Sequence, residues 1–170
     1  MKKFVSALVL ACAPAWVLAA GQHSGGHGAA GHSMGGHSMG GHDMSGMSGI
    51  GKPGDPAKVS RTIEVVMDDT MRFTPAQIDV KAGETIRFFI KNTGKLPHEM
   101  VIGTLADLKA HAEEMKKMPG MQHVEPNMIT LNGGQRGGLV WTFDQAGTVD
   151  FACLIPGHME AGMVGKVRVN

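Results

Sequence analysis

One short stretch near the C-terminal end, residues 153–163 (CLIPGHMEAGM), restricts what this chain can fold into. Cys153, His158 and Met163 follow one another at intervals of five residues, and a Pro-Gly pair favours a turn between the first two. Strand-like runs lie on both sides of the stretch. A thiolate, an imidazole and a thioether on one loop are soft ligands that suit copper. We therefore expect a β fold that closes this loop around a metal ion.

A site of this kind needs a second imidazole, because the blue-copper pattern combines two histidines and one cysteine with a weak axial methionine. His98 is the candidate, since it follows a strand-like run and the turn-forming segment 94–97. It could instead be a structural turn histidine. Cys153 could likewise be an ordinary core cysteine, but the histidine and methionine beside it favour coordination. Met163 is the better axial candidate than Met159, which directly follows the loop histidine and should point away from it.

The first 20 residues predict a secretory signal peptide. Lys2 and Lys3 precede an apolar run, residues 4–18, that is too short for a comfortable membrane span and ends in small residues. The alternative is a lipobox that ends at Cys12 and makes it a lipidated anchor. The chain has two cysteines, so removal of the signal would leave Cys153 without a disulfide partner in an oxidising compartment. We expect a periplasmic protein with no membrane span in its mature form.

Residues 21–58 are predicted to form a disordered tail and linker, because Gly, His, Ser and Met dominate and almost nothing there can pack a core. The sequence Gly-His-Ser-Met-Gly occurs at 31–35 and again at 36–40. Imidazole binds Cu(II) and thioether binds Cu(I), so we expect additional copper on this tail; the alternative is a linker of accidental composition. The candidate tail ligands are His23, His27, His32, Met34, His37, Met39, His42, Met44 and Met47.

From residue 59 onward the sequence predicts an all-β sandwich. Apolar and polar residues alternate in 61–67, and Ile86, Phe88 and Ile90 share one face of a second run. Short strands separated by regular turn signals are typical of a β-sandwich. We expect strands at 61–67, 71–73, 77–80, 85–91, 98–102, 139–143, 148–153 and 164–169.

Residues 105–117 interrupt this pattern and are predicted to form a helix. It should begin near Thr104 or Asp107, stop before Pro119 and cover the β core with one apolar face. The helix and its exit loop also suggest a candidate second copper site, although a helical methionine stripe is more often packing. The residues of this site are His111, Met115, Met118, Met121 and His123.

Residues 59–170 resemble the cupredoxins, which are type 1 copper proteins, and most closely the exported bacterial cupredoxins linked to copper tolerance. The resemblance rests on the histidine after NTGKLP, on HEMVIG and on the ending WTFDQAGTVDFACLIPGHMEAGMVGKV. It implies a Greek-key β-sandwich with one type 1 copper, and electron transfer through the exposed edge of the His158 ring. The implied ligands are His98, Cys153, His158 and Met163. The cysteine-to-histidine spacing exceeds that of plastocyanin-like loops, so blue and green geometries both stay open.

Two functions are compatible with these features. The first is a periplasmic copper-tolerance protein that binds and redox-cycles copper, with the tail as collector. The second is an electron shuttle between redox partners. We do not expect an enzyme, because a copper oxidase or nitrite reductase needs more copper ligands and usually a second domain. A net charge of +1 without a basic patch gives no reason to expect nucleic acid. The expected partners are copper ions and a periplasmic redox partner, copper exporter or oxidase, and we expect a monomer.

Overall fold

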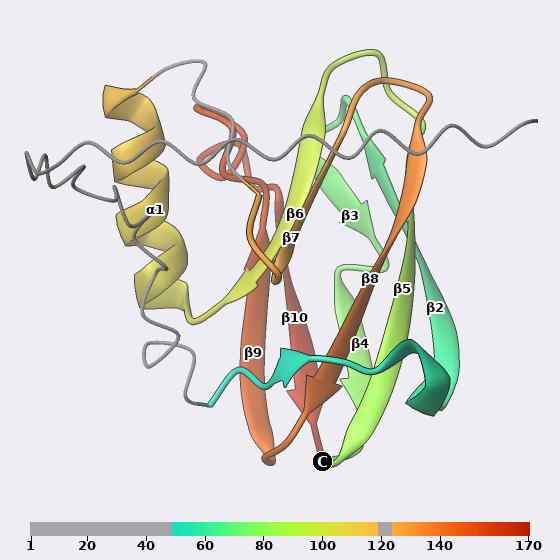
Figure 1. The fold of residues 1–170 in the computed structure, drawn as a ribbon. Helices are drawn as coiled ribbons and strands as arrows, with labels where there is room; N and C mark the ends of the chain where they lie inside the picture. Colours follow the sequence, from blue (N-terminus) through green and yellow to red (C-terminus); the bar gives the residue numbers. More distant parts are fainter. Residues whose placement is uncertain (1–48, 119–123) are drawn as a thin grey trace, which may run out of the picture. The chain divides into compact units, whose positions relative to one another are not determined.

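The computed structural model describes residues 49–118 and 124–170, in which two five-stranded sheets pack face to face (Figure 1). In spatial order, the first sheet consists of β1 (Lys52–Pro53), β8 (Arg136–Phe143), β5 (Glu84–Asn92), β2 (Arg61–Asp68) and β3 (Arg72–Thr74). The second consists of β4 (Gln77–Val80), β10 (Val164–Val169), β9 (Gly147–Ala152), β6 (His98–Gly103) and β7 (Met128–Leu131). The predicted all-β sandwich is confirmed.

The core between the sheets follows from alternation along the strands. In β5, Ile86, Phe88 and Ile90 are fully buried, as the sequence pattern predicts, and Trp141 of the neighbouring β8 joins them. The pairs β2–β5 and β4–β10 are parallel, and the remaining pairs are antiparallel. This core gives the loops at the ends of the strands a rigid base.

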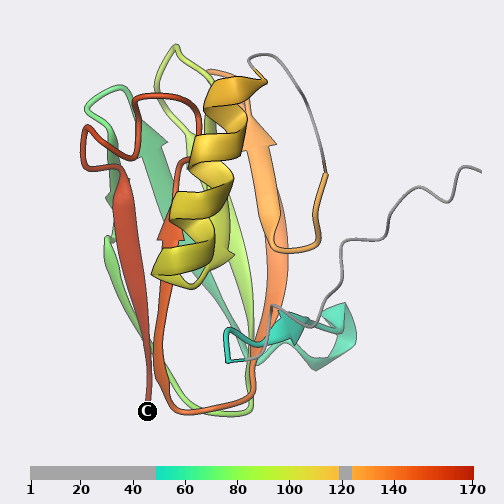
Figure 2. The same ribbon diagram turned by 90° about the vertical axis from the view of Figure 1, so that its left-hand side faces the viewer.

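The predicted helix, α1 (Leu105–Lys117), has the bounds that the sequence indicates. The Thr104 hydroxyl caps it by accepting the N–H of Asp107 at 3.1 Å. Leu108 and Ala112 are buried against residues of β6 and β9, so α1 covers the outer face of the second sheet (Figures 1 and 2). None of the helices in the described part of the chain is long and apolar enough to span a membrane.

The packed domain includes residues upstream of the predicted start at residue 59. Ile50 is buried, and its carbonyl accepts the indole N–H of Trp141 at 2.6 Å. Strand β1 then pairs with β8, and a 3₁₀ helix (Pro56–Lys58) leads into β2. Strands β1 and β7 were not predicted from the sequence. The C-terminal end of the predicted linker therefore belongs to the sandwich.

Candidate metal centre

The ligand loop, residues 153–163, joins β9 to β10 at the end of the sandwich opposite the C-terminus (Figure 1). The N–H of His158 closes a turn in which Gly157 has a φ of +91°, the value that the second central residue of a type II turn requires. Cys153 N–H donates to the Met163 carbonyl at 3.1 Å, and Met163 N–H donates to the His158 carbonyl at 3.0 Å. Backbone hydrogen bonds thus hold the three predicted loop ligands in one compact unit.

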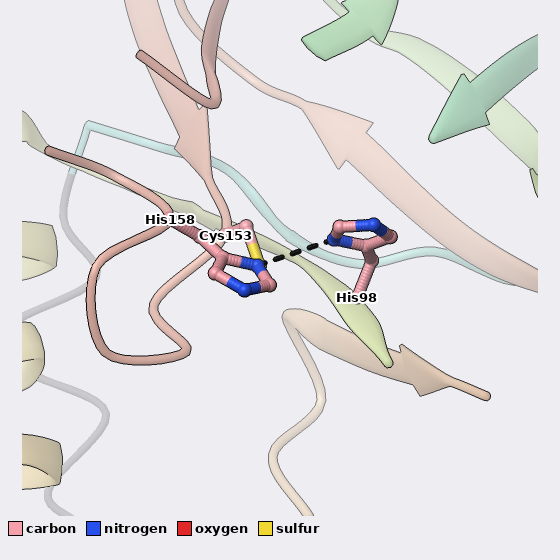
Figure 3. Close-up of side chains that lie close together, drawn as sticks. All are labelled: His98, Cys153 and His158. Carbon is pink, nitrogen blue, oxygen red and sulfur yellow. Dashed lines mark hydrogen bonds between the residues drawn. The ribbon is translucent and has the colours of Figure 1, made fainter. Parts of the chain in front are cut away.

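Strand pairing brings His98 to this loop from a distant part of the sequence. His98 is the first residue of β6, and β6 runs antiparallel to β9, which ends just before Cys153. His158 Nδ1 lies 3.2 Å from His98 Nδ1 and 3.3 Å from Cys153 Sγ (Figure 3). Among the His, Cys, Asp and Glu side chains of the described residues, these three form a group in which all the ligand atoms lie within 4.8 Å of one another.

The spacing of these three atoms fits a metal ion. With metal–nitrogen and metal–sulfur distances of about 2.0 and 2.3 Å, as for zinc, ligand atoms in a trigonal plane are roughly 3.5 Å apart. The printed separations of 3.2 and 3.3 Å are close to this value. A cation would also satisfy the lone pairs that two imidazoles and a sulfur direct at one another. The combination of imidazole and thiolate suits copper.

Burial sets the protonation of the loop ligands when no metal is bound. It raises the pKa of the Cys153 thiol to about 12, although the backbone N–H groups of Glu99 and Ile155 lower it. Burial, followed by the charge of His98, lowers the pKa of His158. A neutral imidazole has a free lone pair for a metal, whereas the thiol must lose its proton. Metal binding therefore releases a proton from Cys153.

The two methionines of the ligand loop have different surroundings. Met163 is fully buried in the core cluster that also contains Cys153. Met159 is partly buried and packs against the cluster formed by α1, β6 and β9, which includes Leu108 and Leu154. Met163 is thus the methionine that shares a cluster with the cysteine, and its role as axial ligand remains a prediction.

Glu99, the residue after His98, connects the two sides of the centre. Its backbone N–H donates to Cys153 Sγ at 3.4 Å, and its buried carboxylate accepts the backbone N–H of Leu154 at 2.9 Å. Thr130 Oγ1 on β7 lies 3.4 Å from the other carboxylate oxygen. Glu99 therefore fixes the cysteine relative to the strand that carries His98.

Asp69, in the turn after β2, was not among the residues predicted from the sequence. Asp69 Oδ1 lies 3.3 Å from His98 Nε2, on the side of the ring opposite Nδ1. Backbone hydrogen bonds from Lys95 and Leu96, with a smaller contribution from His98, lower the pKa of this carboxyl group. Nothing in the sequence around Asp69 indicates the contact, because the fold alone brings the turn after β2 to the start of β6.

Three of the other predicted copper ligands lie in the described residues. His111 and Met115 are half-buried on α1, and Met118, which follows the helix, is 44% exposed. Met121 and His123 lie outside the described residues, as do all nine candidate ligands of the tail. The second site and the tail sites stay predictions.

A two-sheet β-sandwich with two histidines and a cysteine converging at one end defines the class of the cupredoxins. The chain belongs to the plastocyanin/azurin family of copper-binding proteins, whose family description matches residues 60–170. The resemblance seen in the sequence is thereby confirmed.

Within this family, the chain is similar to copper-resistance proteins and to a solved auracyanin structure. The chain is 58% identical over 120 residues to the copper-resistant cuproprotein CopI of Rubrivivax gelatinosus, covering 71% of this chain and 73% of that protein. It is 40% identical over 152 residues to CopI of Pseudomonas aeruginosa, covering 71% of this chain and 82% of the relative. Among solved structures, reduced auracyanin from Roseiflexus castenholzii matches with a TM-score of 0.55 and 27% identity, over 66% of this chain and 98% of auracyanin.

Proposed function

We propose that His98, Cys153, His158 and Met163 hold one type 1 copper ion, and that the chain serves copper tolerance by binding and redox-cycling copper. The observation that carries this proposal is the convergence of two imidazoles and the lone described cysteine at a buried end of the sandwich. The copper-resistant cuproproteins among the relatives support the biological role.

The protein's contribution to such a centre is to hold the ligands still. His98 and Cys153 are fully buried at the ends of paired strands, and Met163 is fully buried immediately before β10. Bound copper would supply one-electron redox chemistry. A ligand set fixed by strands and loop hydrogen bonds changes little between oxidation states, which is what redox cycling requires.

The remaining parts of the proposal concern the setting of the protein. The signal-like N-terminus supports a periplasmic location, and the His- and Met-rich tail supports collection of further copper before it reaches the domain. A binding role rather than catalysis is the role that the cuproproteins among the relatives support. A periplasmic exporter, oxidase or redox protein would then be the partner that supplies or receives copper or electrons.

The decisive experiment is an absorption and EPR spectrum of the protein with one equivalent of Cu(II). We expect an intense visible thiolate band that disappears in Cys153→Ser. A weak spectrum that Cys153→Ser leaves unchanged would mean that copper sits elsewhere, and the proposed centre would be wrong.

Electron shuttling is the second candidate function, and the exposure of the ligands favours it. His158 is partly exposed, whereas the other three candidate ligands are fully buried. Deletion of residues 21–48 separates the two functions. A loss of copper survival with the thiolate band intact would support copper tolerance through the tail. Unchanged survival together with continued electron transfer to a redox partner would favour the shuttle.

A further inference from the structure

Asp69 is held in place by backbone groups rather than by mobile side chains. Its two carboxylate oxygens accept the N–H of Lys95 at 3.0 and 2.8 Å, and Oδ1 also accepts the N–H of Leu96 at 3.1 Å. Gly94 makes this approach feasible, since a Cβ there would collide with the carboxylate. The negative charge is therefore fixed beside the loop that leads into His98.

The same carboxylate faces one edge of the His98 ring. Asp69 Oδ1 lies 3.3 Å from Nε2, while Nδ1 on the opposite edge faces Cys153 and His158. An ionised carboxylate can only accept a hydrogen bond, so the contact requires the ring proton to be on Nε2. In the neutral ring, Nδ1 is then left with a free lone pair directed toward the other two ligand atoms.

We propose that Asp69 is a positioning residue that selects the Nε2–H tautomer of His98 and, as a fixed negative charge, favours Cu(II) over Cu(I) at the centre. The inference rests on the proposed copper site. A carboxylate behind a ligating histidine orients the ring and increases its basicity. His98 is fully buried, so little water lies between the charge and the ring to weaken this effect. Asp69 itself is partly exposed, with 37% of its side chain accessible, which limits its desolvation penalty.

A purely structural role for Asp69 makes different predictions. If the carboxylate only fixed the 94–96 turn, its replacement would lower stability without a specific effect on the oxidation state of copper. Asp69→Asn removes the charge and keeps one side-chain oxygen, which in the Oδ1 position can still accept from Lys95 and Leu96, while the second acceptor of the Lys95 N–H is lost. The matched control is Asp144→Asn, which changes net charge equally but lies directly after β8 and pairs with Lys52 on the surface.

The experiment measures the reduction potential of the copper-loaded full chain and its variants. For Asp69→Asn we expect the ratio of Cu(II) to Cu(I) affinity to fall by roughly tenfold, the smallest effect typical of removing a group that supports a metal ligand. A tenfold fall in this ratio raises the reduction potential by about 59 mV. Asp144→Asn should leave the potential at the wild-type value. Equal shifts in both variants, or none in either, would overturn the assignment of the charge effect.

A second measurement uses the metal-free protein and so does not depend on copper loading. Nitrogen NMR of the His98 ring should show the Nε2–H tautomer in the wild type, and Asp69→Ala should release the ring to a mixture of tautomers. An Nδ1–H tautomer in the wild type would overturn the proposal even if no variant folds. If the wild type shows no Cys153-dependent copper band, that is a separate result, because it would refute the copper site itself.

Discussion

At the scale of single residues, the centre depends on a thiol that burial keeps protonated. Cys153 is fully buried, and its pKa of about 12 compares with an ordinary value of 9.0. The folded protein thus favours the neutral thiol, whereas the unfolded chain ionises near the ordinary value. The contribution of this group to stability is complete below pH 9 and is lost as the pH rises toward 12.

The metal-free protein should therefore lose stability in alkaline solution through Cys153. Between pH 9 and 12, we expect the free energy of unfolding to fall by up to about 1.4 kcal/mol per pH unit from this group. Urea unfolding of the wild type and of Cys153→Ala, both with a chelator present, measures the effect. The chain has no tyrosine, so no phenol ionises in the same range. Equal alkaline slopes in the two proteins would contradict the buried neutral thiol.

The axial assignment of Met163 can be tested by a substitution that conserves volume. Met163→Leu should cost less than about 1.5 kcal/mol of stability, because the side chains have similar volume. It should nevertheless shift the visible band and raise the reduction potential, since the centre loses a sulfur donor. Met159→Leu is the control, because Met159 packs against the helix cluster. If the control moved the spectrum and Met163→Leu did not, the axial ligand would be Met159.

At the scale of elements, α1 supports the loop as well as covering the sheet. Leu108 and Ala112 share a cluster with Ala152 and Leu154, the residues on either side of Cys153. Lys116 near the end of α1 pairs with Glu160 of the ligand loop at 2.6 Å. The latter contact is exposed and adds little stability, so the apolar cluster is what docks the helix beside the centre.

Leu108→Ala should destabilise the domain by about 2–5 kcal/mol, because it leaves a cavity under the helix. Leu105→Ala, on the same helix, should change stability by less than about 0.5 kcal/mol. The difference follows from exposure, which is 2% for Leu108 and 44% for Leu105. Thermal or urea unfolding of both variants measures it. Similar losses in the two variants would show that the helix does not dock through its buried face.

The sequence predicted elements where local patterns are strong and missed those that depend on distant partners. Alternation identified β2 and β5, and the capping residue and following proline identified α1. Strand β1 has only two residues, and β7 (MITL) lacks the regular polar–apolar alternation of the equally short β4 (QIDV), so their partners alone make them strands. The loop motif likewise indicated Cys153 and His158, whereas Asp69 meets His98 only through the arrangement of the strands.

At the scale of the whole molecule, the division between tail and domain lies within the predicted linker. Ile50 fills a place in the core, and Gly51, with a φ of +96°, passes so close to β8 that a side chain would collide with Thr142. The packed domain thus starts no later than Ile50. The tail ligands, which end at Met47, lie just upstream of this point, so the tail can be removed without cutting into the sandwich.

Two deletions that differ by ten residues test this division. Removal of residues 21–48 should leave the free energy of unfolding within about 0.5 kcal/mol of the full chain, since it removes none of the described packing. Removal of residues 21–58 should cost about 3 kcal/mol or more, because it exposes the site that Ile50 fills and leaves the Trp141 N–H without its acceptor. Urea unfolding of the metal-free variants measures both changes.

Copper stoichiometry on the same deletions tests what the tail contributes. With residues 21–48 removed, bound copper should fall to one equivalent while the thiolate band persists, because the proposed ligands His98, Cys153, His158 and Met163 all remain. The longer deletion should give the same single equivalent wherever it still folds, since residues 49–58 hold no candidate ligand. An unchanged copper count after the shorter deletion would show that the tail binds none. A lost thiolate band would instead mean that the tail helps to form the centre, and the separation of collector and redox site would be wrong.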